Sequence, residues 1–189
     1  MAKIEVRIGG LGGQGVILCG MILGKAAAIY DGKHAALIQA FGPEARGSAC
    51  SAQVTVADEA IGYPYVKHPD ILVLMSQDAY TQFGPTLKPG GLLLYEDELV
   101  QLDGSLPAGA RTVGIPATRF AEELGRRLVL NIVMAGFLTG VTDLVSQDAI
   151  ERAVKDSVPK GTEDLNLRAL RKGLEYGREM VAKAEVRAR

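Results

Sequence analysis

The chain has 189 residues and a nearly balanced charge, with 21 Lys plus Arg against 22 Asp plus Glu. This balance provides neither the basic excess that nucleic-acid binding requires nor a charged tail. Hydrophobic residues reach 48% with only 5% aromatics, a mix typical of strands that helices bury on both faces. The length suits one α/β domain over residues 1–189.

The sequence contains few cysteine and histidine residues, the types that commonly bind metals. Cys19 and Cys50 form no disulfide framework and are too few to hold an iron–sulfur cluster, and His34 and His68 lack zinc-site spacing. We therefore predict no metal ligands. The apolar stretch Leu128–Val141 is shorter than the roughly 20 residues that span a bilayer. With no signal-peptide pattern at the start, we expect a cytoplasmic protein that binds neither membrane nor nucleic acid.

Alternating and apolar runs predict strands that are separated by helices and loops over the first part of the chain. The predicted strands are Ile4–Gly9, Ala35–Ala40, Ser48–Ala57, Ile71–Met75, Leu92–Tyr95 and Arg111–Ile115. Helical spacing predicts a helix over Val16–Tyr30, which Gly32 ends, and a short helix over Gln77–Phe83, which Ser76 caps. Ile61–Pro69 is expected to be a connection.

From Pro116 onward the pattern is helical. The predicted helices are Phe120–Arg126, Leu128–Val141, Ala149–Val158 with Ser146 as its cap, and a final helix capped by Thr162. The strand–helix alternation that precedes them predicts an α/β fold: a Rossmann-like, mostly parallel sheet flanked by helices. The C-terminal portion is predicted to be helical.

A glycine-rich loop separates the first predicted strand from the first helix. Its sequence, Gly9–Gly15 (GGLGGQG), exposes backbone N–H groups near a helix N-terminus, and such a nest attracts phosphate or carboxylate. The glycines are equally consistent with a tight turn that serves packing alone. Gln14 is needed for neither purpose, so its side chain could reach a ligand or a partner subunit.

The same loop matches the dinucleotide fingerprint G-x-G-x-x-G in its strand–turn–helix context. However, that fingerprint requires an acidic residue about 20 positions further on, at the end of the second strand. Gln39, Ala40 and Phe41 stand there instead, which weakens the interpretation as an NAD site.

A second loop, Phe41–Ser48 (FGPEARGS), follows the second predicted strand and should open on the same sheet edge. Glu44 and Arg46 can simply pair with each other on the surface, an interaction of little energetic value. Alternatively, Arg46 presents its planar fork to a carboxylate or phosphate while Glu44 holds it in place. The spacing leaves both interpretations open. No combination of side chains suggests a catalytic triad or carboxylate pair, so we predict no catalytic residue.

Together the two loops resemble a family: the gamma subunits of the pyruvate, ketoisovalerate and 2-oxoglutarate:ferredoxin oxidoreductases. These carry G-x-G-G-Q-G after the first strand and G-P-E-x-R-G after the second, here at Gly10–Gly15 and Gly42–Gly47. Tyr63-Pro64 and Lys88-Pro89-Gly90-Gly91 are further similarities. The alanine at position 45 resembles the 2-oxoglutarate branch.

The resemblance implies a subunit of a complex that decarboxylates a 2-oxoacid on thiamine diphosphate and Mg²⁺, reduces ferredoxin through [4Fe-4S] clusters, and transfers the acyl group to coenzyme A. Alpha and beta chains, with a ferredoxin-like delta chain as a further candidate, would be its partners and carry these cofactors. The residues expected to face coenzyme A phosphates or a partner subunit are Gly10, Gly12, Gly13, Gln14, Gly15, Glu44 and Arg46. The alternatives are a stand-alone NAD(P)-dependent oxidoreductase and a small module that binds coenzyme A or a nucleotide.

Overall fold

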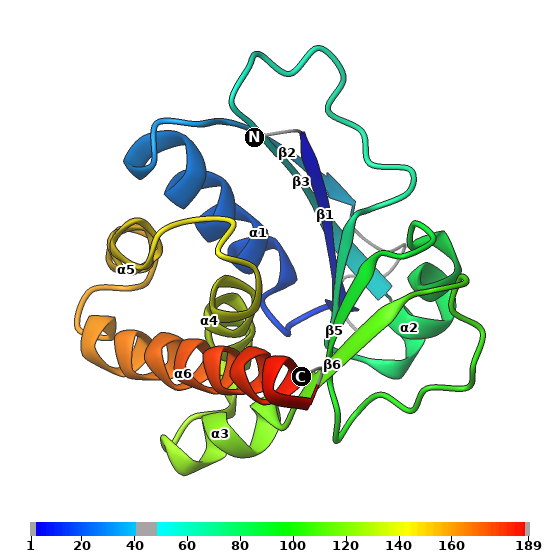
Figure 1. The fold of residues 1–189 in the computed structure, drawn as a ribbon. Coiled ribbons are helices and arrows are strands. Elements are labelled where there is room, and N and C mark those ends of the chain that lie inside the picture. The colour runs from blue at the N-terminus through cyan, green and yellow to red at the C-terminus, as the bar shows by residue number, and fades with distance from the viewer. Residues whose placement is uncertain (1–2, 41–48, 188–189) are drawn as a thin grey trace.

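The computed structural model describes residues 3–40 and 49–187, with a six-stranded sheet at its centre (Figure 1). The strands are β1 (Ile4–Leu11), β2 (His34–Ala40), β3 (Ala49–Ala57), β4 (Ile71–Leu74), β5 (Leu92–Glu96) and β6 (Arg111–Ile115), in the spatial order β2–β3–β1–β4–β5–β6. Four neighbouring strands, β1, β4, β5 and β6, are parallel, and β3 runs antiparallel to both β1 and β2. The predicted Rossmann-like, mostly parallel sheet is confirmed.

The antiparallel β3 brings two loops to one edge of the sheet. Because β1 and β2 each pair with β3 in antiparallel fashion, they run in the same direction. Leu11 at the end of β1 pairs with Ala49 at the start of β3, and Ala40 at the end of β2 pairs with Ser51. The end of β2 and the start of β3 therefore lie on the same sheet edge as the glycine-rich loop.

The helices lie close to where the sequence predicts them. They are α1 (Val16–Lys25), continued by a π-helical turn over Ala26–Tyr30, α2 (Gln77–Phe83), α3 (Ala117–Glu123), α4 (Leu130–Thr142), α5 (Gln147–Lys155) and α6 (Glu163–Arg187). Short 3₁₀ turns cover Gly84–Thr86 and Arg127–Val129. Ser76 and Ser146 cap α2 and α5 as predicted, by accepting hydrogen bonds from the N–H groups of Ala79 and Ala149.

Several helix ends differ from the prediction by one to three residues, and the start of α3 has a clear cause. α3 begins three residues earlier than expected, at Ala117 instead of Phe120. The carboxylate of Glu96, at the end of β5, accepts a hydrogen bond from the Thr118 N–H and satisfies the first turn from outside the helix. At α6, the Thr162 hydroxyl donates to the Pro159 carbonyl and accepts from the Asn166 amide. The Glu96 contact joins residues 22 positions apart, so local spacing did not reveal it.

The two faces of the sheet are covered differently (Figure 1). Helices α1, α3, α4, α5 and α6 gather on one face, over the larger apolar core. α2 lies on the opposite face in contact with β1, β3 and β4, and alternate residues of β4 and β5 such as Leu72, Leu74 and Leu93 form a second cluster there. The apolar strand residues of this second cluster therefore come from β4 and β5.

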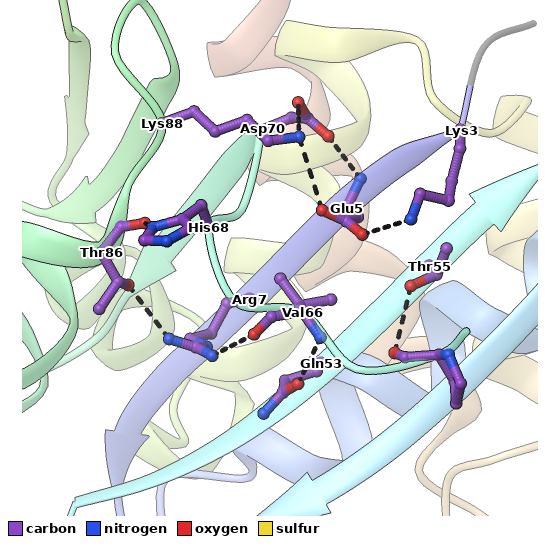
Figure 2. Close-up of polar contacts among 11 residues, drawn as sticks. Lys3, Glu5, Arg7, Gln53, Thr55, Val66, His68, Asp70, Thr86 and Lys88 are labelled. Atoms are coloured by element: carbon purple, nitrogen blue, oxygen red, sulfur yellow. Dashed lines mark hydrogen bonds and ion pairs between the residues drawn. The ribbon is translucent and has the colours of Figure 1, made fainter.

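Polar side chains cover the remaining half of the second face (Figure 2). Arg7 of β1 is 9% exposed and donates to the carbonyl of Val66 and to the hydroxyl of Thr86. Its guanidinium carbon lies 5.3 Å from the ring centre of Phe83, and burial lowers the pKa of Arg7. Gln53 of β3 accepts from the Val66 N–H at 2.8 Å. The connection between β3 and β4 is thus bound to the sheet by hydrogen bonds.

An ion-pair network extends this polar layer to the amino end of β1 (Figure 2). Lys88 lies 2.7 Å from Asp70 and 3.5 Å from Glu5, and Lys3 lies 2.6 Å from Glu5. Asp70 also accepts the backbone N–H of Glu5 at 2.8 Å. The hydrogen bond to Asp70 raises the pKa of Lys88. The network ties the starts of β1 and β4 to the turn before β5.

Helices α4 and α6 approach each other closely enough for their backbones to touch. A Cβ on Gly136 would lie 2.0 Å from the Leu170 carbonyl oxygen, and one on Gly173 would lie 2.0 Å from the Val133 carbonyl oxygen. Gly140 and Gly177, one turn further along each helix, meet the opposite backbone in the same way. Only glycine allows this separation, because any side chain would strike a main-chain atom that cannot turn aside.

We therefore expect Gly136→Ala and Gly173→Ala each to lower the free energy of unfolding by about 1–3 kcal/mol, as overpacking does. The change would oppose the intrinsic preference for alanine in helices, which favours it by up to about 1 kcal/mol. Urea unfolding followed by circular dichroism measures this. Gly24→Ala in α1, where a Cβ would meet nothing within 4 Å, is the matched control and should be neutral or stabilising. Equal effects at all three positions would contradict the interpretation.

Candidate functional site

The glycine-rich loop has a defined conformation at the carboxyl edge of the sheet. Gly13 has a φ of 96° and Gly15 a φ of 73°, both in the left-handed region that side chains disfavour. Gly15 immediately precedes α1, so the loop turns directly into the helix N-terminus. The first-turn N–H groups of α1 are consequently directed towards the loop, in the arrangement that favours anions.

The side chain of Gln14 links this loop to the neighbouring strand. Its Oε1 accepts from the Leu11 N–H at 2.7 Å, and its Nε2 donates to the Met75 carbonyl at 2.8 Å. A Cβ on Gly10 would lie 2.7 Å from the same Oε1, so glycine at position 10 leaves the space that the amide occupies. Both ends of the Gln14 amide are therefore used to join the ends of β1 and β4.

A second amide fixes the loop from the helical layer. Asn131, in the first turn of α4, is 3% exposed and donates from Nδ2 to the Gly15 carbonyl at 3.1 Å. A Cβ on Gly15 would lie only 2.4 Å from this nitrogen. The loop is thus held by Gln14 on the sheet side and by Asn131 on the helix side. The sequence analysis assigned no role to Asn131, because only the tertiary fold brings it to the loop.

A hollow of about 180 Å³ adjoins the loop. It is lined by Gly13, Gln14, Leu99, Arg127, Leu128 and Leu130. The side chain of Arg127 is 67% exposed, with only a loose contact of 4.0 Å to Glu122, and Leu128 is 77% exposed. The sequence analysis did not single out Arg127. The sequence signal for this residue was the run Gly125–Leu128 between two helices, in which two arginines and an apolar residue follow a glycine.

Of the predicted site residues, Gly10, Gly12, Gly13, Gln14 and Gly15 lie together in this loop. Glu44 and Arg46 fall in segment 41–48, outside the described residues. Pairing between Glu44 and Arg46 and anion binding by Arg46 therefore both stay predictions. The register nevertheless places Ala49, which follows that segment, beside Leu11, and Ala40, which precedes it, beside Ser51. The two loops of the predicted site therefore start from adjacent positions on one sheet edge.

A buried carboxyl group lies at the end of β5 on the same edge. Glu96 is fully buried, and its Oε1 accepts from the Thr118 N–H at 3.1 Å. Its Oε2 has no hydrogen-bond partner in the described part of the chain. Burial raises the pKa of Glu96, and the charge of Glu98 raises it further. Its contact with Thr118 starts α3, so its role here is structural.

The two cysteines are packing residues. Both are buried, and burial raises the pKa of Cys19 to about 12. A thiol with such a pKa supplies almost no thiolate near neutral pH, so Cys19 is unsuited to nucleophilic chemistry. Across residues 3–40 and 49–187, no three His, Cys, Asp or Glu side chains gather as a metal site. In the same ranges, no helix has the length and apolar character needed to cross a membrane.

Comparison with known proteins shows which family has this architecture. Residues 5–176 match the family described as pyruvate ferredoxin/flavodoxin oxidoreductase. The chain belongs to this family. It is 48% identical over 177 residues to the 2-oxoglutarate synthase subunit KorC of Methanocaldococcus jannaschii, covering 93% of this chain and 95% of the relative. The family predicted from the two loop motifs is confirmed.

Two further matches show which subunit this chain corresponds to. The gamma subunit of a keto/oxoacid ferredoxin oxidoreductase from Geobacter sulfurreducens superposes with a TM-score of 0.82 at 36% identity, covering 93% of this chain and 99% of that one. The ketoisovalerate oxidoreductase subunit VorA of Methanothermobacter thermautotrophicus is 34% identical over 95% of this chain, but only 37% of VorA is covered. The gamma-subunit prediction is confirmed, and neither a stand-alone NAD(P)-dependent enzyme nor an isolated binding module is favoured.

The buried Glu96 carboxyl makes a pH-dependent contribution to stability. Its ordinary pKa is 4.5, and its pKa in the folded state is raised. Between these two values the folded state binds the proton more tightly than the unfolded state, so stability falls as pH rises through that window. Glu96→Gln keeps an oxygen for the Thr118 N–H and removes the charge. We expect the variant to melt at a higher temperature than wild type at pH 8, with the difference narrowing towards pH 4.5.

Glu59→Gln, at an exposed glutamate between β3 and β4, is the control for this measurement and should show no such trend. A Glu96→Gln variant whose melting temperature falls further below that of wild type as pH rises would show that the ionised carboxylate is favourable where it lies.

Proposed function

We propose that this chain is the gamma subunit of a complex that acts on 2-oxoglutarate. The observation that carries the proposal is the 48% identity to a 2-oxoglutarate synthase subunit, compared with 34% to a ketoisovalerate oxidoreductase subunit. The Gly42–Gly47 motif, with alanine before its arginine, agrees with this assignment. The complex would convert 2-oxoglutarate and coenzyme A to succinyl-coenzyme A and CO₂, while two electrons pass to ferredoxin.

Partner chains would supply the cofactors. A [4Fe-4S] cluster needs four cysteine ligands, and this chain has two cysteines, both buried. We therefore propose that alpha and beta chains hold thiamine diphosphate with Mg²⁺, that the clusters lie on chains other than this one, and that a delta chain can join them. Thiamine diphosphate, when bound there, supplies the carbanion chemistry of decarboxylation. A cytoplasmic location is proposed for the whole assembly.

The carboxyl edge of the sheet is our candidate contact for coenzyme A. The glycine loop offers N–H groups at a helix N-terminus, and Arg127 adds a cation with an apolar neighbour, Leu128. An adenosine diphosphate group with a pantetheine arm presents this combination of phosphates and apolar surface. We propose that Arg46 completes the anion contacts. In this assignment, Gln14 and Asn131 fix the loop and do not bind the ligand themselves.

Affinity capture of the tagged chain from its native cell tests the function. We expect alpha and beta chains to co-purify and the eluate to reduce viologen in a coenzyme A-dependent manner, fastest with 2-oxoglutarate. Pyruvate and 2-oxoisovalerate are the comparison substrates. Activity that favours either of these would reassign the substrate, whereas an inactive lone chain that binds a dinucleotide would overturn the subunit assignment.

Two arginine variants test the coenzyme A contact in the assembled complex. We expect Arg46→Ala and Arg127→Ala each to raise the KM for coenzyme A by about tenfold, the size of one lost charged hydrogen bond, with the KM for 2-oxoglutarate unchanged. Lys160→Ala, an exposed lysine between α5 and α6, is the charge-matched control. An unchanged KM for coenzyme A with less co-purified alpha chain would instead assign this edge to the partner subunit.

A further inference from the structure

A groove of about 900 Å³ lies at the amino edge of the sheet, opposite the glycine loop. Its floor is formed by the first residues of four strands: Ile4, Ile71, Leu92 and Arg111. Its walls are the Pro89–Gly91 turn on one side and the ends of α4 and α6 on the other. Neither the glycine loop nor the hollow beside it contributes to this groove.

The groove has the shape and surface of a site for a polypeptide segment. Neighbouring strands lie about 4.8 Å apart, so a channel across four strands extends about 14 Å, the length of roughly four extended residues. The lining is mainly apolar, with Ile71, Val113 and Val141 facing Met180 and Val181 of α6. β6 forms the edge of the sheet beside it, and the unpaired main chain of an edge strand can bind another chain.

The charges at the groove identify the polar character of its occupant. Asp70 and Lys88 are already paired with each other and with β1, so neither needs an external partner. Arg111 is exposed, and within the described residues its side chain makes no ion pair or hydrogen bond. Glu185, an exposed carboxylate, also lines the groove, so an occupant with apolar side chains, a carboxylate beside Arg111 and no strong net charge would satisfy this surface.

The positions of the two chain ends indicate where such an occupant comes from. Ile4 and Glu185 both line the groove, so the amino and carboxyl ends of the described chain border it. In VorA, the region similar to this chain makes up only 37% of the polypeptide. In a domain of this fold, a polypeptide joined to either end would therefore enter or leave beside this groove.

We propose that this amino-edge groove is the docking site for an apolar segment of the catalytic partner chain that carries a carboxylate for Arg111, the counterpart of the additional polypeptide in VorA. The inference rests on the proposed function, because it requires a partner chain of that kind. The carboxyl edge is then left for the ligand, and the amino edge holds the subunit in the assembly.

Two alanines on α6 provide a matched test. Ala184 lines the groove, whereas Ala182 is exposed and lies outside it, about 200° away around the helix. Each is changed to arginine, and the tagged full-length chain is co-expressed with the alpha and beta chains. We expect Ala184→Arg to reduce the captured partner by about tenfold and Ala182→Arg to leave it unchanged. Arg111→Glu, which alters no buried group, should also reduce capture.

Circular dichroism and the melting temperature of the isolated variants separate folding from docking, and all three should resemble wild type. Full capture by both Ala184→Arg and Arg111→Glu would overturn the inference while the proposed function stands. A wild-type chain that captures no thiamine-binding partner would overturn the proposed function itself. If the wild-type chain alone is a dimer that Ala184→Arg dissociates, the occupant is a second copy, and the partner assignment is wrong.

Discussion

The contact between α4 and α6 sets the position of nearly everything at the carboxyl edge. Four glycines, Gly136, Gly140, Gly173 and Gly177, allow the two helix backbones to meet at distances that exclude a Cβ. A helix held at the main chain has little freedom to slide or rotate, because carbonyl groups cannot repack as side chains do. The first turn of α4 then brings Asn131 to Gly15 and Leu130 to the hollow.

The glycine loop is therefore rigid despite its composition. Glycine makes the left-handed turns at positions 13 and 15 possible, but it also increases the conformational entropy of the unfolded loop. Two side-chain amides offset that cost by replacing the hydrogen bonds that a regular strand or helix would make. A loop fixed in this manner presents its N–H groups without reorganisation, which suits recognition of an anion.

The two edges of the sheet differ in kind, and the difference follows from strand direction. At the carboxyl edge, parallel strands end in loops and helix N-termini, whose dipoles and N–H groups attract negative charge. At the amino edge, the strands begin under an apolar rim, and the one unpaired cation is Arg111 among the described residues that line the groove there. In the assignment proposed above, ligand contacts and subunit contacts are therefore separated by the length of the strands.

The sequence by itself determined the strands, most helices, two serine caps and both loop motifs, because these depend on local periodicity, glycine and proline. It also identified the family, since two motifs at a fixed separation are far more specific than one. Only the tertiary structure decided that Gln14 turns inward, that Asn131 and Arg127 join the loop, and that Glu96 starts α3. These contacts connect residues that lie between 22 and 116 positions apart, and no local pattern encodes which distant group will satisfy a given N–H or carbonyl.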